Sequence, residues 1–397
     1  MSFEGFIHPG FPDFLDLPWT KPLLDWNGGL VRLVDLPKGL SRHPVVYVNY
    51  GDDVYAIKEL PVGKARQEHE LLSEMAALRL PGVTPVGYRE NKVNGKTTSA
   101  LITRYLDHSL PYRSLFMSTS LDRYREHLLD AIAGLMVQLH LAGVYWGDCS
   151  LSNTLFRRDA GALQAYLVDA ETAVIYKEIS AAQRYDDLVI MEENIDGELL
   201  DLSSANLLAA GVPISETGRY IRIRYQKLWE EITREVVINP GEHYRIQEHI
   251  RALNALGFSI DDVEFTESKN GDQLHLRVIV SDRNFHHDQL LTLTGIDAQE
   301  NQAQQIMNEI QEIKATLSSR NNRSTPLAVA AYYWLENIFY PVVNQLKKNS
   351  RENERRDLAE IYCQILEHKW FLSEKAKHDV GHQFATNDYL EHVLPSE

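Results

Sequence analysis

The sequence predicts an α+β protein in which a small antiparallel-sheet lobe precedes a mostly helical lobe and a mostly helical C-terminal region. Three observations support this fold class. Short β-branched runs separated by turn residues fill the first hundred residues, and longer segments with helical periodicity follow them. A β-branched run on either side of Asn270-Gly271 predicts one hairpin within the C-terminal region. We expect three parts, at residues 1–103, 104–225 and 226–397.

The first lobe begins with an aromatic and proline-rich segment, residues 1–28, that predicts an irregular arm. The runs "LVRLVDL", "PVVYVNY" and "DVYAIKEL" then predict antiparallel strands, and Gly51-Asp52-Asp53 is a typical hairpin turn. A helix is expected over "KARQEHELLSEMAALRL", because Leu72 and Met75 recur on one face, and Pro81-Gly82 ends it. The run "SALITRYL" predicts a further strand.

The second lobe begins with the long helix "LDRYREHLLDAIAGLMVQLHLAG". Its apolar stripe includes Leu128, Ile132 and Leu135, and Gly143 is a stop signal. A polar loop, "VYWGDCSLSNTLF", follows, and "TLFRRDAGALQAYLVD" predicts a hairpin. In the C-terminal region, "YQKLWEEITREV" and "RIQEHIRALNALGF" predict helices, as does most of residues 297–393, with a break at "SSRNNRSTP".

Composition narrows the possible partners. The 397 residues carry a net charge of −16, which disfavours nucleic acid and anionic membranes as whole-surface partners. The two cysteines, Cys149 and Cys363, exclude a disulfide scaffold and indicate reduced thiols. The first twenty residues lack the features of a signal peptide, and no apolar run approaches ~18 residues. We expect a cytoplasmic protein without membrane insertion, of undetermined oligomeric state.

A lysine and a glutamate are expected to form an ion pair. Lys58 lies in the strand "VYAIKEL", where a buried ammonium needs a partner, although a lysine at a strand edge facing water would look the same. At 100° per residue, Glu68 falls in the middle of the apolar stripe of the following helix, whereas Glu70 points away and Glu74 lies on the flank. Glu68 is therefore the preferred partner, and Glu74 is the alternative.

The polar loop and the end of the hairpin supply oxygen ligands and a base. Asp148 and Asn153 have the D-x-x-x-x-N spacing of a kinase catalytic loop, although an ordinary Asp/Asn turn can share it. Asp169 follows the hairpin, with Glu171 close by. Phosphoryl transfer requires a cation on the phosphates, oxygen ligands for magnesium and an acceptor for the hydroxyl proton. The lysine, the glutamate of the next helix, the Asp148/Asn153 loop and Asp169 occur in this order along the chain. Together they predict a kinase-like, two-lobed fold.

The chain resembles the protein-kinase-like superfamily, and within it the bacterial lipopolysaccharide-kinase-like (Kdo/WaaP-type) branch. More narrowly, it resembles the bacterial family DUF4032. "GLSRHPV", "YAIKEL", "ALITRYL", "GVYWGDCSLSNTLF", "LVDAETA" and "QRYDDL" carry the resemblance in the first part, and "IRALNALGF", "LTLTGIDAQENQA" and "LEHKWFLSE" carry it in the second. The kinase-like resemblance covers roughly residues 30–225, and the narrower one is expected to cover most of the chain.

The resemblance implies a role for each candidate residue. Lys58 would contact the α- and β-phosphates of ATP, Glu68 would pair with it, and Asp148 would be the catalytic base. Asn153 and Asp169 would bind Mg²⁺. Asp187, in "RYDDL", resembles the aspartate that supports the catalytic loop, although it also suits the surface of a charged helix. A turn at "PKGLSRH" would cover the phosphates with three residues, which are Gly39, Ser41 and Arg42.

The sequence departs from the protein-kinase pattern. Trp146 and Gly147 replace the histidine and arginine of the catalytic loop, and Asp169-Ala170-Glu171 replaces Asp-Phe-Gly. No G-x-G-x-x-G or Ala-Pro-Glu segment is present. These departures argue against regulation of the protein-kinase type, but they leave the metal and base positions intact.

The resulting prediction is an ATP- and Mg²⁺-dependent phosphotransferase acting on an unknown, non-protein hydroxyl acceptor. A nucleotide-binding pseudokinase or scaffold and a nucleotidyl (AMP) transferase on the same fold are the alternatives. Other polar clusters are interpreted as structural. "FHHDQ", with His286 and His287, is typical of a solvated turn, Glu367-His368 of a packing site, and His140 of a core or capping residue. Cys149 is expected to be a small packing residue.

Overall fold

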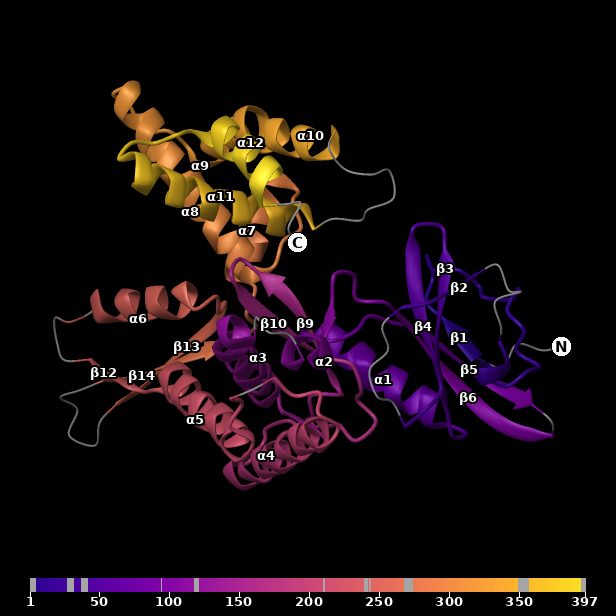
Figure 1. The fold of residues 1–397 in the computed structure, drawn as a ribbon. Coiled ribbons are helices and arrows are strands. Elements are labelled where there is room, and N and C mark those ends of the chain that lie inside the picture. Colours follow the sequence, from indigo (N-terminus) through magenta and orange to yellow (C-terminus); the bar gives the residue numbers. More distant parts are fainter. Residues whose placement is uncertain are drawn as a thin grey trace. The chain divides into compact units, whose positions relative to one another are not determined.

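The computed structural model divides the chain into two compact units (Figure 1). Unit 1 comprises Met1–Arg157 and Gln164–Glu231, and unit 2 comprises Arg158–Leu163 and Ile232–Glu397. The structure describes residues 5–26, 32–36, 42–93, 95–117, 121–209, 211–238, 242, 244–267, 274–348 and 357–393.

Unit 1 begins with a six-stranded antiparallel sheet in the order β1-β5-β6-β4-β3-β2. Gly51, at φ +62°, makes the tight turn between β3 and β4, where Tyr50 pairs with Asp53. The predicted hairpin is thus confirmed. Its strands and their helix are β1 (Gly5–Ile7), β2 (Leu33–Val34), β3 (Val45–Tyr50), β4 (Asp53–Leu60), α1 (Lys64–Ala77), β5 (Pro85–Val93) and β6 (Lys96–Arg104).

The N-terminal arm is more ordered than the sequence predicts. It contributes strand β1 and a short 3₁₀ turn, η1 (Leu23–Asp25), and three of its aromatic residues are buried against the sheet. Phe14, Trp19 and Trp26 belong to one core cluster with Val48 and Ile57. Because an irregular backbone can still bury large rings, composition alone did not reveal this packing.

The rest of unit 1 is mainly helical and carries two small sheets, β10-β9-β7 and β11-β8. A capping box between Ser180 and Gln183 starts α4. Both the long helix and the β9–β10 hairpin lie where the sequence predicts them. The elements are β7 (Leu110–Pro111), α2 (Tyr112–Phe116), α3 (Leu121–Leu141), β8 (Val144–Tyr145), β9 (Thr154–Asp159), β10 (Ala162–Leu167), β11 (Val174–Ile175), α4 (Ala181–Ser204) and α5 (Ile214–Thr233).

Unit 2 combines a three-stranded antiparallel sheet, β12-β14-β13, with helices. The hairpin predicted around Asn270-Gly271 is present as β13 and β14, and its turn lies outside the described residues. The elements are β12 (Val236–Ile238), α6 (Tyr244–Ala255), β13 (Ile260–Glu267), β14 (Leu274–Val280), α7 (Phe285–Thr294), α8 (Glu300–Arg320), α9 (Leu327–Trp334), a π-helical turn η2 (Leu335–Phe339), α10 (Tyr340–Lys348), α11 (Leu358–Ala376) and α12 (His382–His392).

The segment "FHHDQ" is the first turn of a helix, which corrects the prediction of a solvated turn. The backbone N–H groups of His286 and His287 both donate to the carboxylate of Glu300, at 3.0 Å each, and His286 Nδ1 lies 2.7 Å from it. A distant glutamate therefore caps α7, which the local sequence did not indicate. Among the described residues, no group of three His, Cys, Asp or Glu could hold a metal ion.

The tip of the β9–β10 hairpin belongs to unit 2, although its strands begin and end in unit 1. The Asp159 carboxylate is fully buried and accepts the backbone N–H groups of Asn301 at 3.2 Å and Gln302 at 2.8 Å. Glu360 accepts the N–H of Ala160 at 2.9 Å. Two carboxylates thus hold the hairpin tip against the N-terminus of α8 and against α11.

Candidate active site

Lys58 lies in the middle of the sheet, on β4 between its neighbours β3 and β6. Its Nζ atom is 3.2 Å from Glu68 Oε2 and 2.6 Å from Asp169 Oδ2. Glu68 is 1% exposed, whereas Glu74 lies on the exposed side of α1. The structure therefore brings Lys58 together with Glu68, the glutamate that the helical periodicity favoured.

Burial affects the pKa values of both members of this ion pair. Desolvation raises the pKa of Glu68 to about 7, although the nearby Lys58 ammonium opposes that shift. Desolvation also acts to lower the pKa of Lys58, but the attraction of Glu68 and Asp169 outweighs it, so its pKa is raised. Lys58 therefore stays a cation at neutral pH.

Asp148 is held by two amides from different elements. Asn153 Nδ2 donates to Asp148 Oδ2 at 3.1 Å, and Asn194 Nδ2 donates to Oδ1 at 3.1 Å. Asn194 comes from α4 and also donates to the backbone carbonyl of Cys149 at 3.1 Å. The two contacts fix the carboxylate from both sides, which favours a base with a defined orientation.

Asp187 supports this loop from within the core. Its fully buried carboxylate accepts the backbone N–H groups of Trp146 and Gly147, both at 2.8 Å. The ring of His140 lies 3.1 Å away and also contacts the hydroxyl of Tyr225 at 2.8 Å. The surface alternative for Asp187 is wrong, and His140 is the core residue that the sequence predicted.

The two replaced positions of the catalytic loop have structural roles. The indole Nε1 of Trp146 donates to the backbone carbonyl of Asp169 at 3.0 Å, which joins the loop to the end of the hairpin. Gly147 has φ +75°, and a Cβ there would lie 3.0 Å from the Tyr145 ring. Glycine is therefore favoured at this position both by its backbone and by its surroundings.

Two residues of α4 that no sequence motif indicated, Asn194 and Glu198, also hold the loop. Glu198 accepts the N–H groups of Leu151 at 2.7 Å and Ser152 at 3.1 Å, so it holds the centre of the loop. Burial raises its pKa. The two residues follow Asp187 by seven and eleven positions, which places all three on one helical face. This helical spacing from Asp187 is the sequence signal that could have indicated Asn194 and Glu198.

Lys58, Asn194 and Glu198 line one pocket of about 750 Å³ in unit 1. Its lining includes Asp148, Asn153 and Asp169 together with Lys58 and Arg42. Of the phosphate-covering turn, only His43 and Arg42 of "SRH" are described, and Gly39 and Ser41 lie outside the described residues. His43 Nε2 lies 3.5 Å from Glu171 Oε2 at the same pocket.

The oxygen atoms around this pocket suit a magnesium ion that is also bound to phosphate. Asn153 uses its amide nitrogen toward Asp148, so its Oδ1 atom is the acceptor left for a cation. Asp169 adds a carboxylate, one oxygen of which accepts the N–H of Glu171 at 3.0 Å. Two protein oxygens are few, but Mg²⁺ usually retains waters and takes its other ligands from phosphates.

The remaining cysteine and histidine candidates are structural. Cys149 is fully buried beside Asp148, and desolvation raises the pKa of its thiol well above its usual range, which fits a packing residue. His368 Nε2 lies 2.7 Å from Asp388 Oδ2 within unit 2, whereas Glu367 and the neighbouring Trp370 and Phe371 are exposed, so the predicted packing site at Glu367-His368 is wrong. No helix among the residues described here is long and apolar enough to cross a membrane.

The sheet, the helical part and the order of Lys58, Glu68, Asp148, Asn153 and Asp169 define a protein-kinase-like fold. Residues 51–208 match the model of the lipopolysaccharide kinase (Kdo/WaaP) family, and residues 227–394 match the domain of unknown function DUF4032. The two resemblances seen in the sequence are thus confirmed. The DUF4032 match is narrower than expected, because it is confined to the C-terminal region.

Comparisons with solved structures and with curated proteins gave the following results. One solved structure, described as "WaaP in complex with acyl carrier protein", is similar with 16% sequence identity and a TM-score of 0.34. The match covers 56% of this chain and 88% of the other. No curated protein matches the sequence.

Proposed function

We propose that unit 1 is an ATP- and Mg²⁺-dependent phosphotransferase that acts on a non-protein hydroxyl acceptor. The proposal rests on one observation: the side chains of Lys58, Asp148, Asn153 and Asp169 all line one pocket. Lys58 is held between Glu68 and Asp169, and Asp148 and Asn153 face the same space. A phosphate-binding cation, a carboxylate base and oxygen ligands for a metal are the set that phosphoryl transfer requires.

Each residue has a defined task in this scheme. Lys58 binds the α- and β-phosphates, and Glu68 keeps the ammonium in place. Asn153 and Asp169 would hold a magnesium ion, which would supply positive charge to neutralise the phosphates. Asp148 takes the proton of the acceptor hydroxyl while the hydroxyl oxygen bonds to the γ-phosphorus and the bond to the ADP oxygen breaks. The products are ADP and a phosphate monoester.

A non-protein acceptor is favoured by the connection that follows the metal ligand. Only residues 170–180, which include the two-residue strand β11, lie between Asp169 and α4, and no Ala-Pro-Glu segment is present in the sequence. A protein substrate is usually received by a longer, ordered activation segment. A small acceptor needs only the pocket beside Asp148.

The test is a product analysis with ATP and Mg²⁺ and a pool of small hydroxyl compounds. Mass spectrometry separates a phosphoryl addition from an adenylyl addition, because the two groups differ in mass. We expect phosphorylated products with wild type and with the control Asp52→Asn, which changes an exposed turn residue. Asp148→Asn should abolish them. An adenylylated product would favour nucleotidyl transfer, and binding of ATP without any product would favour the pseudokinase.

A further inference from the structure

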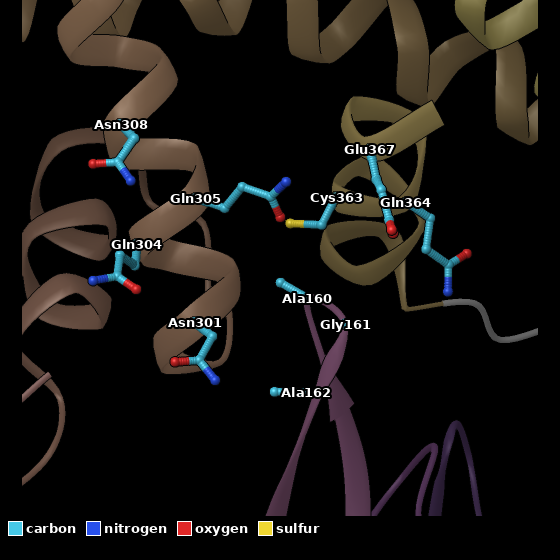
Figure 2. Close-up of a pocket in the computed structure, with 10 residues that line it drawn as sticks. All are labelled: Ala160, Gly161, Ala162, Asn301, Gln304, Gln305, Asn308, Cys363, Gln364 and Glu367. Carbon is cyan, nitrogen blue, oxygen red and sulfur yellow. The ribbon is translucent and has the colours of Figure 1, made fainter. Parts of the chain in front are cut away.

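A second cavity, of about 360 Å³, lies within unit 2 between α8, α11 and the tip of the β9–β10 hairpin (Figure 2). Its volume is at the lower end of the range for small-molecule sites. Five of its ten lining residues are Asn or Gln, and Lys, Arg and His are all absent from the lining. The lining is therefore polar, with amides as its main hydrogen-bonding groups.

Helical spacing concentrates four of these amides. Asn301, Gln304, Gln305 and Asn308 fall at i, i+3, i+4 and i+7 of α8, so they share one face of that helix. The opposite face of α8 is buried in the core of unit 2. Figure 2 shows the Gln305 side chain extending toward Cys363 of α11 across the cavity.

Two of the amides are fixed in orientation by contacts behind the wall. Gln304 Nε2 donates to the backbone carbonyl of Ala255 at 2.8 Å, which leaves its amide oxygen as an acceptor. Asn301 Oδ1 accepts from Arg283 at 3.1 Å, which leaves its NH₂ group as a donor. The wall therefore presents a preformed acceptor and a preformed donor.

Three further polar side chains of the wall have unused hydrogen-bonding capacity. Gln305 and Asn308 make no side-chain hydrogen bond within the described part of the chain, and Glu367 is exposed and makes none there either. The hairpin tip opposite them consists of Ala160, Gly161 and Ala162, whose small side chains leave the space open. A ligand can reach donors and acceptors on both helices.

The acidic residues in and around the lining disfavour anionic ligands. Glu367 lies at the cavity, and the buried carboxylates of Asp159 and Glu360 lie at the adjoining hairpin tip. With no basic residue in the lining, a phosphate or carboxylate ligand would meet only negative charge and amides. The site therefore suits an uncharged ligand.

We propose that this cavity binds a neutral polyhydroxy compound, of the class of monosaccharides and polyols. A hydroxyl group both donates and accepts, so it pairs with either end of an amide and with a carboxylate. The lining has no aromatic residue for a flat apolar ligand to stack on. The site belongs to unit 2, so the proposal does not depend on phosphotransfer in unit 1.

The experiment is calorimetry of the full-length chain with glucose, galactose, maltose and myo-inositol, each tested separately. We expect at least one of them to bind wild type. The double variant Gln305→Leu/Asn308→Leu removes two unpaired amides from the wall while keeping similar volumes, and it should weaken that binding at least about tenfold. Gln247→Leu, an exposed glutamine of α6 outside the lining, is the matched control and should leave the affinity unchanged.

Two more measurements place the ligand and define its class. Hydrogen–deuterium exchange should show slower exchange at the hairpin tip and at the start of α8 when the sugar is bound. Glucose 6-phosphate should bind more weakly than glucose. The proposal is overturned if none of the four compounds binds, if the double variant binds as well as wild type, or if the phosphorylated sugar binds more tightly.

Discussion

The ion pair between Lys58 and Glu68 makes a quantitative prediction. Lys58→Met leaves the Glu68 carboxylate buried at 1% exposure, with the Ala170 N–H at 3.3 Å as a remaining donor. Removing one partner of a buried ion pair typically costs about 3–5 kcal/mol. Glu68→Gln costs less, because Asp169 Oδ2 remains 2.6 Å from the Lys58 ammonium. We expect about 1–3 kcal/mol for that change.

The double variant Lys58→Met/Glu68→Gln buries two uncharged groups, so its cost should be smaller than the sum of the single changes. We expect a coupling free energy of about 2 kcal/mol. The assay is urea unfolding followed by hydrogen–deuterium exchange of peptides from unit 1, so that unfolding of unit 2 does not enter the result.

The matched control is the Arg66–Glu70 pair, on the same helix at 2.8 Å but with both side chains largely exposed. Solvent screening should leave little coupling there. If the coupling of Lys58 with Glu68 were no larger than that of the control pair, Glu68 would not be the partner that holds Lys58.

Three further predictions follow from single contacts. Asp187→Ala removes the acceptor of two buried N–H groups and should lower the free energy of unfolding by about 2–6 kcal/mol in urea, whereas Asp186→Ala, which loses only an exposed hydrogen bond from Tyr145, should cost less than about 1.5 kcal/mol. Gly147→Ala, at φ +75°, should cost about 1–2 kcal/mol in the same assay, and an unchanged midpoint would contradict the strain argument. Burial raises the pKa of Asp159 to about 6. The folded state therefore keeps a proton that the unfolded chain releases near pH 4, so stability should fall by about 2 kcal/mol as pH rises from 4 to 6, out of about 3 kcal/mol for the whole transition. Asp159→Asn should remove that slope, and an identical pH profile would refute the assignment.

The sequence predicted the elements whose signal is local. Periodicity located the helix that carries Glu68, and turn residues located the hairpin at Gly51. Strand β1 escaped notice, because three residues in an aromatic arm carry too little alternation. Strand β5 was also missed, since its Gly87 and its polar residues weaken the strand pattern.

Contacts between distant segments were the hardest to predict. Asp159 and Gln302 meet across 143 positions, and no local pattern indicates that a hairpin tip joins the C-terminal unit. Asn194 and Glu198 share a helical face with Asp187, but only the folded loop reveals what that face supports. The candidate site was therefore predictable where a motif has fixed spacing, and not where a helix from elsewhere completes it.

The most direct test of the central claim is calorimetry of ATP binding with and without Mg²⁺. In the structure, Asp169 Oδ2 contacts Lys58 Nζ at 2.6 Å, and binding of the metal with ATP would bring this carboxylate to the cation. We expect the affinity of wild type for ATP to rise at least about tenfold with Mg²⁺, and Asp169→Ala to lose that rise while the exposed turn variant Asp52→Ala keeps it. An equal magnesium effect in wild type and Asp169→Ala, or no ATP binding by wild type, would contradict the account.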